Sequence, residues 1–199
     1  AGEMATARVP LDVLPQVLQL PLRRVQAARM LRTLHDSSMV AIGAHTVRQR
    51  VQGGWTGATG AGVIFGIIDS GLDIRHPDFI DDAGRSRVLA VWDQTFGASP
   101  PSGFFYGFLC TADAIQAVVL GPGTEACPTQ DFVGHGTHVT GTAAGDGGRT
   151  GAQYAGVAPE AALLVVKGGN TAFAEDRVAD GLVWLRDEAR RRGMPAVVN

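Results

Sequence analysis

The sequence lacks the features that mark membrane and nucleic-acid-binding proteins. No apolar run among its 199 residues approaches the roughly 18 residues that a transmembrane helix requires, so no membrane span is predicted. The net charge is only −2, from 17 Lys and Arg against 19 Asp and Glu. Because phosphate binding needs a concentrated basic surface, no nucleic acid is expected as a partner. The first ten residues, AGEMATARVP, also lack the basic and then apolar pattern of a signal peptide.

Cysteine is scarce as well. Cys110 and Cys127 are the two cysteines of the chain, and they flank a stretch rich in glycine and proline. Their spacing fits no zinc module, which makes metal binding the weaker interpretation. In an oxidising compartment they could close a loop through a disulfide worth about 3 kcal/mol. The sequence leaves their pairing open.

Glycine, in contrast, is abundant. The chain has 27 glycines, about twice the usual share of roughly 7%. They follow no fixed period, which excludes a collagen-like chain and indicates tight turns and close backbone approaches. With 45% hydrophobic and 18% charged residues, the chain has enough apolar surface to bury a core.

The hydrophobic pattern predicts an α/β fold with a mainly parallel sheet. Continuous apolar runs without alternation are typical of strands buried on both faces, and they occur at residues 63–68, 161–166 and 196–198. Between the last two, apolar residues recur at helical spacing from Val178 to Ala189, and Gly193 and Pro195 are stop signals. This βαβ unit should have a right-handed crossover. Residues 87–96 predict a further strand and residues 111–119 a short helix.

Asp69 directly follows the first buried strand. Functional groups gather at the carboxyl ends of parallel strands, so Asp69 is a candidate catalytic acid, with structural or ribose-binding roles as alternatives. Its neighbour Ser70 is not expected to be a nucleophile, because alternation along a strand points it to the opposite side.

His135 lies in the segment GHGTHVTGTAAG, residues 134–145. Its small residues would let a helix lie close to the sheet, with His135 in the first turn. The positive end of the helix dipole disfavours imidazolium, so the sequence predicts a lowered His135 pKa and a neutral ring that can act as a base. An aspartate bonded to the other ring nitrogen would fix the tautomer.

Four segments in order, IIDSGLDIRHPDF, GHGTHVTGTAAG, YAGVAPEAALLVVK and GLVWLRDEARRRGMPAVVN, resemble the subtilisin-type serine proteases, or subtilases. The resemblance covers about residues 53–199. It implies a three-layer α/β/α fold, incomplete in this chain, and a serine endopeptidase that hydrolyses protein or peptide substrates with an Asp-His-Ser triad. Carried over to this sequence, Asp69 is the orienting acid, His135 the general base and His138 a structural histidine.

The resemblance also implies further site residues. Gly168, Gly169 and Asn170 fall near the edge that pairs with an extended substrate backbone. Asp78 falls where many family members place a calcium ligand, but the loop GDGGRTGAQYAG does not match the ligand-bearing version. No cofactor and no metal ligand are therefore assigned, and calcium is left unplaced. Because the family's nucleophilic serine would lie beyond Asn199, the 199-residue chain is expected to be inactive.

The domain organisation follows from the same resemblance. Residues 1–52, with amphipathic stretches at 9–20 and 25–34, are interpreted as a propeptide tail, or alternatively an N-terminal arm. The enzyme's own propeptide would then be its intramolecular inhibitor. Residues 53–199 would be the N-terminal part of a catalytic domain, secreted or at the cell surface. The extra length around residues 95–130 is expected to form an inserted surface excursion.

Three alternatives compete with this hypothesis. His135 and His138 could bind a metal, with His76, Asp69 and Asp78 completing the site. However, metalloproteases space their two histidines by four positions with an intervening Glu. Gly57, Gly60 and Gly62 could suggest a nucleotide-binding module, but they precede the strand that they should follow. A non-catalytic pseudoprotease or binding protein with the same fold is the third alternative.

Overall fold

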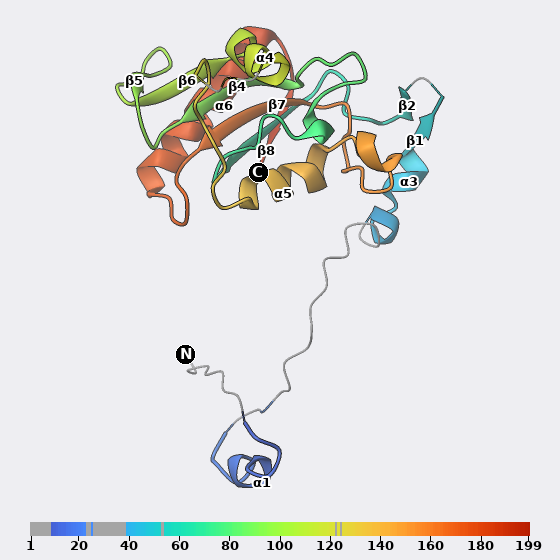
Figure 1. The fold of residues 1–199 in the computed structure, drawn as a ribbon, viewed down its shortest axis with the longest axis vertical. Helices are drawn as coiled ribbons and strands as arrows, with labels where there is room; N and C mark the ends of the chain where they lie inside the picture. Colours follow the sequence, from blue (N-terminus) through green and yellow to red (C-terminus); the bar gives the residue numbers. More distant parts are fainter. Residues whose placement is uncertain (1–8, 23–24, 26–38, 53, 122, 124) are drawn as a thin grey trace. The chain divides into compact units, whose positions relative to one another are not determined.

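The computed structural model describes residues 9–22, 25, 39–52, 54–121, 123 and 125–199. The chain divides into two compact units, residues 1–33 and 34–199. In the first unit the described residues include the short helix α1, Leu14–Val17 (Figure 1). The amphipathic stretch expected at 25–34 lies outside the described residues, apart from Val25. None of the helices in the described ranges is long and apolar enough to cross a membrane.

The second unit alternates strands and helices much as the apolar runs predicted. Its elements, in chain order, are α3 (Ala44–Val47), β1 (Arg48–Val51), β2 (Gly54–Gly57), β3 (Ile64–Asp69), η1 (Pro77–Phe79), β4 (Val88–Asp93), β5 (Ala98–Ser99), β6 (Gly107–Thr111), α4 (Ala112–Leu120), α5 (His135–Ala144), η2 (Gly148–Thr150), β7 (Ala162–Lys167), α6 (Glu175–Arg192) and β8 (Ala196–Val198). The predicted strands are confirmed as β3, β7, β8 and β4, and the predicted helices as α4, α5 and α6.

The main sheet has six strands in the order β5-β6-β4-β7-β3-β8. Its pairs are parallel except for β4 with β6, which is antiparallel. The carboxyl ends of the three central strands coincide, because Lys167 of β7 is the backbone partner of both Asp69 of β3 and Asp93 of β4. The polar residues that end these strands therefore share one edge of the sheet.

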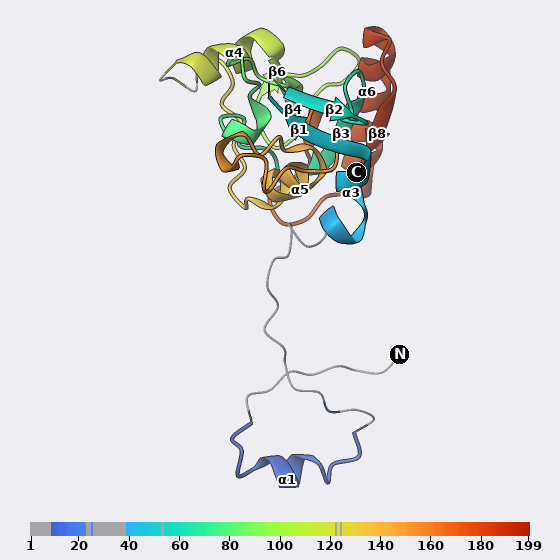
Figure 2. The ribbon, with the colours of Figure 1, turned by 90° about the vertical axis from the view of Figure 1, so that its right-hand side faces the viewer.

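Helices cover both faces of the sheet (Figure 2). Leu163 and Val165 of β7 face the cluster that includes residues of α4 and α5, whereas Leu164 and Val166 face the cluster formed with α6. Successive residues of a strand point to opposite faces, so a continuous apolar run is buried on both sides. This arrangement gives the three layers of the predicted α/β/α architecture.

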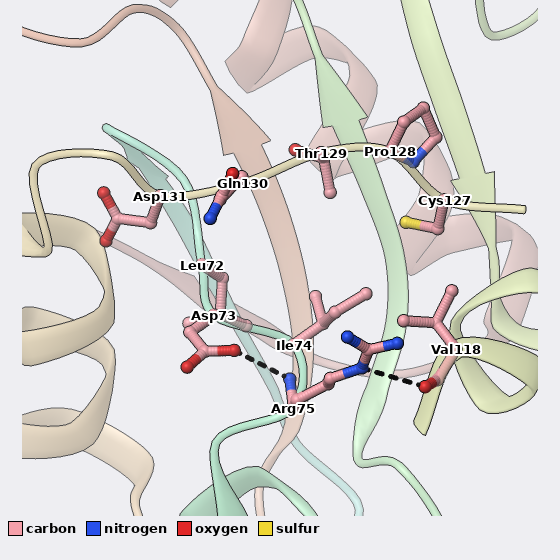
Figure 3. Close-up of a pocket in the computed structure, with 10 residues that line it drawn as sticks. All are labelled: Leu72, Asp73, Ile74, Arg75, Val118, Cys127, Pro128, Thr129, Gln130 and Asp131. Carbon is pink, nitrogen blue, oxygen red and sulfur yellow. Dashed lines mark hydrogen bonds between the residues drawn. The ribbon is translucent and has the colours of Figure 1, made fainter. Parts of the chain in front are cut away.

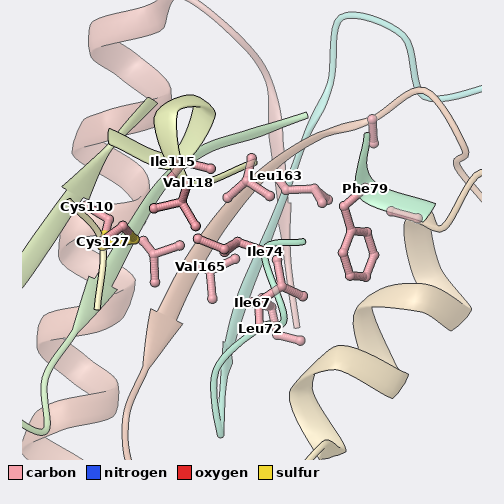
Figure 4. Packing of buried hydrophobic residues seen from close by; sticks show 14 residues of the cluster. Ile67, Leu72, Ile74, Phe79, Cys110, Ile115, Val118, Cys127, Leu163 and Val165 are labelled. Atoms are coloured by element: carbon pink, nitrogen blue, oxygen red, sulfur yellow. A yellow bond between two sulfur atoms is a disulfide. The ribbon is translucent and has the colours of Figure 1, made fainter. Parts of the chain in front are cut away.

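Part of the segment expected to be a surface excursion packs into the core, although many of its residues are exposed. Strand β6 pairs with β4, and Ile115 and Val118 of α4 are buried against the sheet (Figure 4). Cys110 and Cys127 form a disulfide inside the same cluster, which settles their pairing. The expectation was wrong for β6 and α4, because a helix with apolar residues three positions apart buries that face on the sheet.

The β1–β2 hairpin joins residues on both sides of position 52. Arg48 pairs with Gly57 in its register, and the Arg48 side chain is buried. Its Nε donates to the carbonyl of Val157 at 2.8 Å, and its Nη2 donates to the carbonyls of Ala155 and Gly156. Residues 48–52 thus belong to the second unit, which begins at residue 34.

Candidate active site

Asp69 and His135 meet at the carboxyl edge of the sheet. Asp69 ends β3 and His135 begins α5, and the Asp69 Oδ1 lies 2.7 Å from the His135 Nδ1. The Asp69 side chain is 10% exposed and the His135 side chain 65% exposed. The pair therefore combines a fixed carboxylate with an imidazole whose outer side is accessible to solvent.

Glycine at position 136 allows α5 to approach β3 this closely. A Cβ atom at Gly136 would lie 2.2 Å from the carbonyl oxygen of Gly71, in the turn after β3. Gly134 precedes the helix with a φ of 79°, a left-handed conformation that favours glycine. The glycines on either side of His135 thus set both the start of the helix and its distance from Asp69.

The pKa of His135 is raised, and the predicted lowering is wrong. The largest cause is the hydrogen bond to Asp69, followed by the charge of Asp69. The helix dipole is a partial charge whose effect is weak at an exposed end, whereas a carboxylate at hydrogen-bonding distance carries a full charge. His135 is therefore readier to take up a proton than an isolated histidine.

Ser70 faces the same segment as Asp69, contrary to the alternation argument. Its Oγ donates to Asp131 Oδ1 at 2.8 Å and accepts from the Gly136 N–H at 3.0 Å. Strand β3 ends at Asp69, so the two-residue alternation no longer applies at the next position. With both interactions directed at the start of α5, the Ser70 hydroxyl is engaged in holding that helix.

Asp131 is a site residue that the sequence reasoning missed. Its Oδ1 accepts from Ser70 and from the backbone N–H groups of Val133 and Gly134, while its Oδ2 accepts from both the backbone and the side chain of Thr137. These bonds to the ionised form hold the pKa of Asp131 below its usual value despite partial burial. An aspartate shortly before a helix start is the signal that could have found it.

The pair Asp93 and Lys167 was missed as well. Lys167 is the single lysine of the chain and is 2% exposed, and its Nζ lies 3.6 Å from Asp93 Oδ2. The Nζ also donates to the Gln130 carbonyl at 2.6 Å, and Thr129 Oγ1 donates to Asp93 Oδ2 at 2.8 Å. Figure 3 shows the segment from Cys127 to Asp131 crossing the carboxyl ends of β4 and β7. The segment lines a cavity of about 240 Å³.

A sequence model of the subtilase family matches residues 60–193, more than half of the chain. The chain belongs to the subtilase family. Among curated relatives, the subtilisin-like protease PopC of Myxococcus xanthus is 32% identical over 151 residues, which are 72% of this chain and 25% of PopC. Fervidolysin of Fervidobacterium pennivorans is 27% identical over 147 residues, or 69% of this chain and 16% of fervidolysin.

The fold comparison agrees with this subtilase assignment. The structure of the Clostridium perfringens CspB protease superposes with a TM-score of 0.62 and 28% sequence identity, over 71% of this chain and 29% of CspB. The subtilisin-like α/β/α fold with a mainly parallel sheet is thereby confirmed. This subtilase chain spans less than a third of the length of each of these relatives.

The predicted substrate-binding residues lie beside the Asp69–His135 pair. Gly168 and Gly169 follow β7, and the Gly168 N–H donates to the Asp69 carbonyl at 3.0 Å. A Cβ at Gly168 would lie 2.9 Å from the Phe173 ring, so a larger residue would displace that side chain. Asn170 is exposed. The segment is positioned at the edge of the site, and its role in binding substrate stays a prediction.

The surroundings of Asp78 do not fit the calcium site that the family resemblance suggests. The Arg87 guanidinium donates to the main-chain carbonyls of Asp78, Ala144 and Ala161, which are the kind of oxygen ligand that calcium prefers. Burial raises the pKa of the neighbouring Asp146 carboxyl, which disfavours its ionised form. A second cation here would meet both the bound guanidinium and oxygens that already have a donor.

The histidines considered for a metal site do not gather with other ligands. His138 is exposed on α5, and His76 Nδ1 accepts from the backbone N–H of Asp78 at 3.3 Å. Within the described residues, no group of three or more His, Cys, Asp or Glu side chains could hold a metal ion. The metalloenzyme alternative therefore gains no support from this geometry.

Proposed function

We propose that this chain supplies the acid and the base of a serine endopeptidase that cleaves peptide bonds with an Asp-His-Ser triad. The observation that carries the proposal is the 2.7 Å contact between Asp69 Oδ1 and His135 Nδ1 at the carboxyl edge of the sheet. Relatives with this family fold include PopC, named as a subtilisin-like protease, and the CspB protease.

The geometry assigns each nitrogen of His135 a task. The Nδ1–H donates to Asp69, which fixes the tautomer and leaves Nε2 as the proton acceptor. When Nε2 takes the proton of a serine hydroxyl, the serine oxygen attacks the peptide carbonyl. Nε2 then gives this proton to the amine as the C–N bond breaks, so the amine leaves and an acyl-enzyme remains. The raised pKa of His135 means that the imidazolium formed in this step is stabilised, chiefly by its bond to Asp69. Water then releases the acyl group.

The nucleophilic serine is proposed to lie outside these 199 residues. Among the described residues, no serine hydroxyl is hydrogen-bonded to His135, and Ser70 is directed at Asp131 and Gly136 instead. The 199-residue chain by itself is accordingly proposed to be inactive. The non-catalytic pseudoprotease alternative predicts that a longer chain is inactive too.

The cellular location of the protein and the presence of a propeptide are also proposed. The disulfide between Cys110 and Cys127 supports secretion or display at the cell surface, since such bonds persist in oxidising compartments. An inhibitory propeptide tail is proposed within residues 1–52. The burial of Arg48 against the carbonyls of residues 155–157 supports assigning residues 48–52 to the catalytic unit rather than to a removable leader.

Labelling with a fluorophosphonate probe tests the function. A chain extended at its C-terminus along the same reading frame is expected to label and to hydrolyse casein, whereas the 199-residue chain should do neither. His135→Ala in the extended chain should abolish both signals. His138→Ala is the matched control, because it removes an exposed imidazole one turn further along α5.

Two results would contradict the proposal. Labelling of the 199-residue chain would show that a serine within it is the nucleophile. A folded extended chain that neither labels nor hydrolyses protein would favour the pseudoprotease.

A further inference from the structure

The carboxylate of Asp131 joins two segments that are far apart in the sequence. It accepts the hydroxyl of Ser70 at 2.8 Å, 61 positions away, and the backbone N–H of Thr137 at 2.9 Å within α5. The Thr137 hydroxyl donates to the same carboxylate at 2.7 Å. One side chain therefore holds both the turn that follows β3 and the first turn of α5.

Each segment held in this way carries one member of the acid–base pair. Ser70 directly follows Asp69, and its N–H donates to Asp69 Oδ1 at 2.7 Å. On the other side, Gly136 directly follows His135, and its N–H donates to Ser70 Oγ at 3.0 Å. The path from Asp69 through Ser70 and Asp131 back to the His135 helix is closed by hydrogen bonds.

We propose that Asp131 is a positioning residue that sets the distance between Asp69 and His135 by binding Ser70 and the start of α5 together. The proposal rests on the proposed function, because that function gives the distance its catalytic meaning. Asp131 itself does not touch substrate in this scheme. It acts through Ser70 and through α5.

A helix cap alone does not account for this geometry. The bonds to Val133 and Gly134 would fix the turn before α5, and the bond to Thr137 would satisfy a free N–H of its first turn, without any contact to the sheet. The bond to Ser70 is the additional element, and it is the one that reaches the residue beside Asp69.

The position of Asp131 is in turn fixed by its neighbours in the chain. Gln130 accepts from the buried Lys167 Nζ, and Thr129 donates to the buried Asp93. The Lys167 Nζ also lies 4.8 Å from the centre of the Phe132 ring. Residues on both sides of Asp131 are thus anchored to strand ends, so its carboxylate is presented from a fixed backbone.

Ser70→Ala tests the link without changing any charge near His135. It removes the bond to Asp131 and the bond from Gly136 together, and leaves both carboxylates in place. Ser86→Ala is the matched control, because the Ser86 hydroxyl accepts a backbone N–H at Val88, away from the pair. Asp131→Asn is the second variant, with Asp81→Asn as its control, since Asp81 likewise accepts two backbone N–H groups.

The readout is NMR of the His135 ring in the folded 199-residue chain. In the wild type, the Nδ1 proton should give a slowly exchanging downfield resonance, and the His135 pKa should lie above its ordinary value. In Ser70→Ala and Asp131→Asn this resonance should broaden or vanish. The His135 pKa should fall toward the ordinary value in Ser70→Ala, which decides the question because the charge of Asp131 itself also raises the His135 pKa. Both controls should keep the wild-type resonance and pKa.

In an active, extended chain, Ser70→Ala should lower kcat by roughly 10- to 100-fold with a much smaller change in KM, because the base is misplaced while substrate contacts remain. A Ser70→Ala variant that is folded but keeps the wild-type Nδ1 resonance and His135 pKa would overturn the positioning role. The NMR readout needs no nucleophile. If the extended wild-type chain fails to label while Ser70→Ala still changes the His135 NMR signals, the result counts against the proposed function and not against the positioning of the pair.

Discussion

Two charged pairs lie side by side at one edge of the sheet, and they differ in their access to water. Lys167 is the backbone partner of both Asp69 and Asp93, yet its side chain pairs with Asp93 alone. The side chains of Lys167 and Asp93 are 2% and 0% exposed. The His135 side chain, which pairs with Asp69, is 65% exposed.

This difference in exposure indicates that the two pairs at the strand ends have different roles. A buried ion pair is held in one geometry because either partner alone would be left charged in a poorly solvated place. The exposed imidazole can exchange protons with its surroundings, and its bond to Asp69 biases that exchange toward imidazolium. One pair fixes the segment 129–132, and the other pair is available for proton transfer.

Removing one partner of the buried pair should have the largest effect on stability. Lys167→Met would leave the Asp93 carboxylate buried without its counter-charge and Gln130 without its donor. We expect the free energy of unfolding in urea to fall by about 3–5 kcal/mol. Arg186→Met, which breaks an exposed pair with Asp187, is the control and should change the free energy of unfolding far less.

The double variant Lys167→Met with Asp93→Asn sharpens this comparison. It removes both charges, so it should be more stable than Lys167→Met alone. If the double variant were as unstable as the single one, packing rather than charge burial would explain the loss.

The disulfide should have the next largest effect, because it anchors the other end of the same segment. Cys127 directly precedes Pro128 and Thr129, and it is bonded to Cys110, 17 positions earlier. Replacing both cysteines by alanine should lower the free energy of unfolding by about 3 kcal/mol, chiefly by freeing the unfolded chain. The wild type in excess reductant should show a matching loss in the same urea titration. An unchanged unfolding midpoint in reductant would show that the bond does not constrain the chain.

The partly buried cation Arg87 extends the comparison to a charge that is held mainly by carbonyl oxygens. Arg87→Gln would leave the carbonyls of Asp78, Ala144 and Ala161 without this donor. We expect a loss of about 1–3 kcal/mol, measured by thermal unfolding. Arg85→Gln is the control, because the Arg85 side chain is 76% exposed. Neither calcium nor a chelator should shift the wild-type melting temperature, and a saturable rise with calcium would contradict the Arg87 interpretation.

The sequence predicted the features that depend on local pattern. The continuous apolar runs of β3 and β7 were found because burial on both faces leaves no polar position in them. β8 was found from the same pattern, but as the edge strand it is exposed. The meeting of Asp69 with His135 was expected from the family motifs around each residue. Both kinds of signal lie within a dozen neighbouring residues.

The remaining features depend on partners that are distant in the sequence. Asp93 and Lys167 each look like an ordinary polar residue that ends a strand, and only the sheet order brings them together. Asp131 reaches Ser70 across 61 positions. The sign of the His135 pKa shift was wrong for a different reason: the contact to Asp69 was expected, but its effect on the pKa was given less weight than the helix dipole.

The exposed pair should have the smallest effect on stability, and its sign can be tested. The folded state raises the His135 pKa above its unfolded value of about 6.5. The stabilisation that the contact with Asp69 gives to the folded chain is therefore fully present below that unfolded pKa and is lost as the pH rises through the higher folded pKa.

Asp69→Asn removes the carboxylate, so the His135 pKa measured by NMR should fall. The melting temperature of the wild type relative to Asp69→Asn should then decline across the same pH window. Solvent screens the exposed imidazole, so the change should be far smaller than that of Lys167→Met. A His135 pKa unchanged by Asp69→Asn would mean that the two side chains are not bonded in solution.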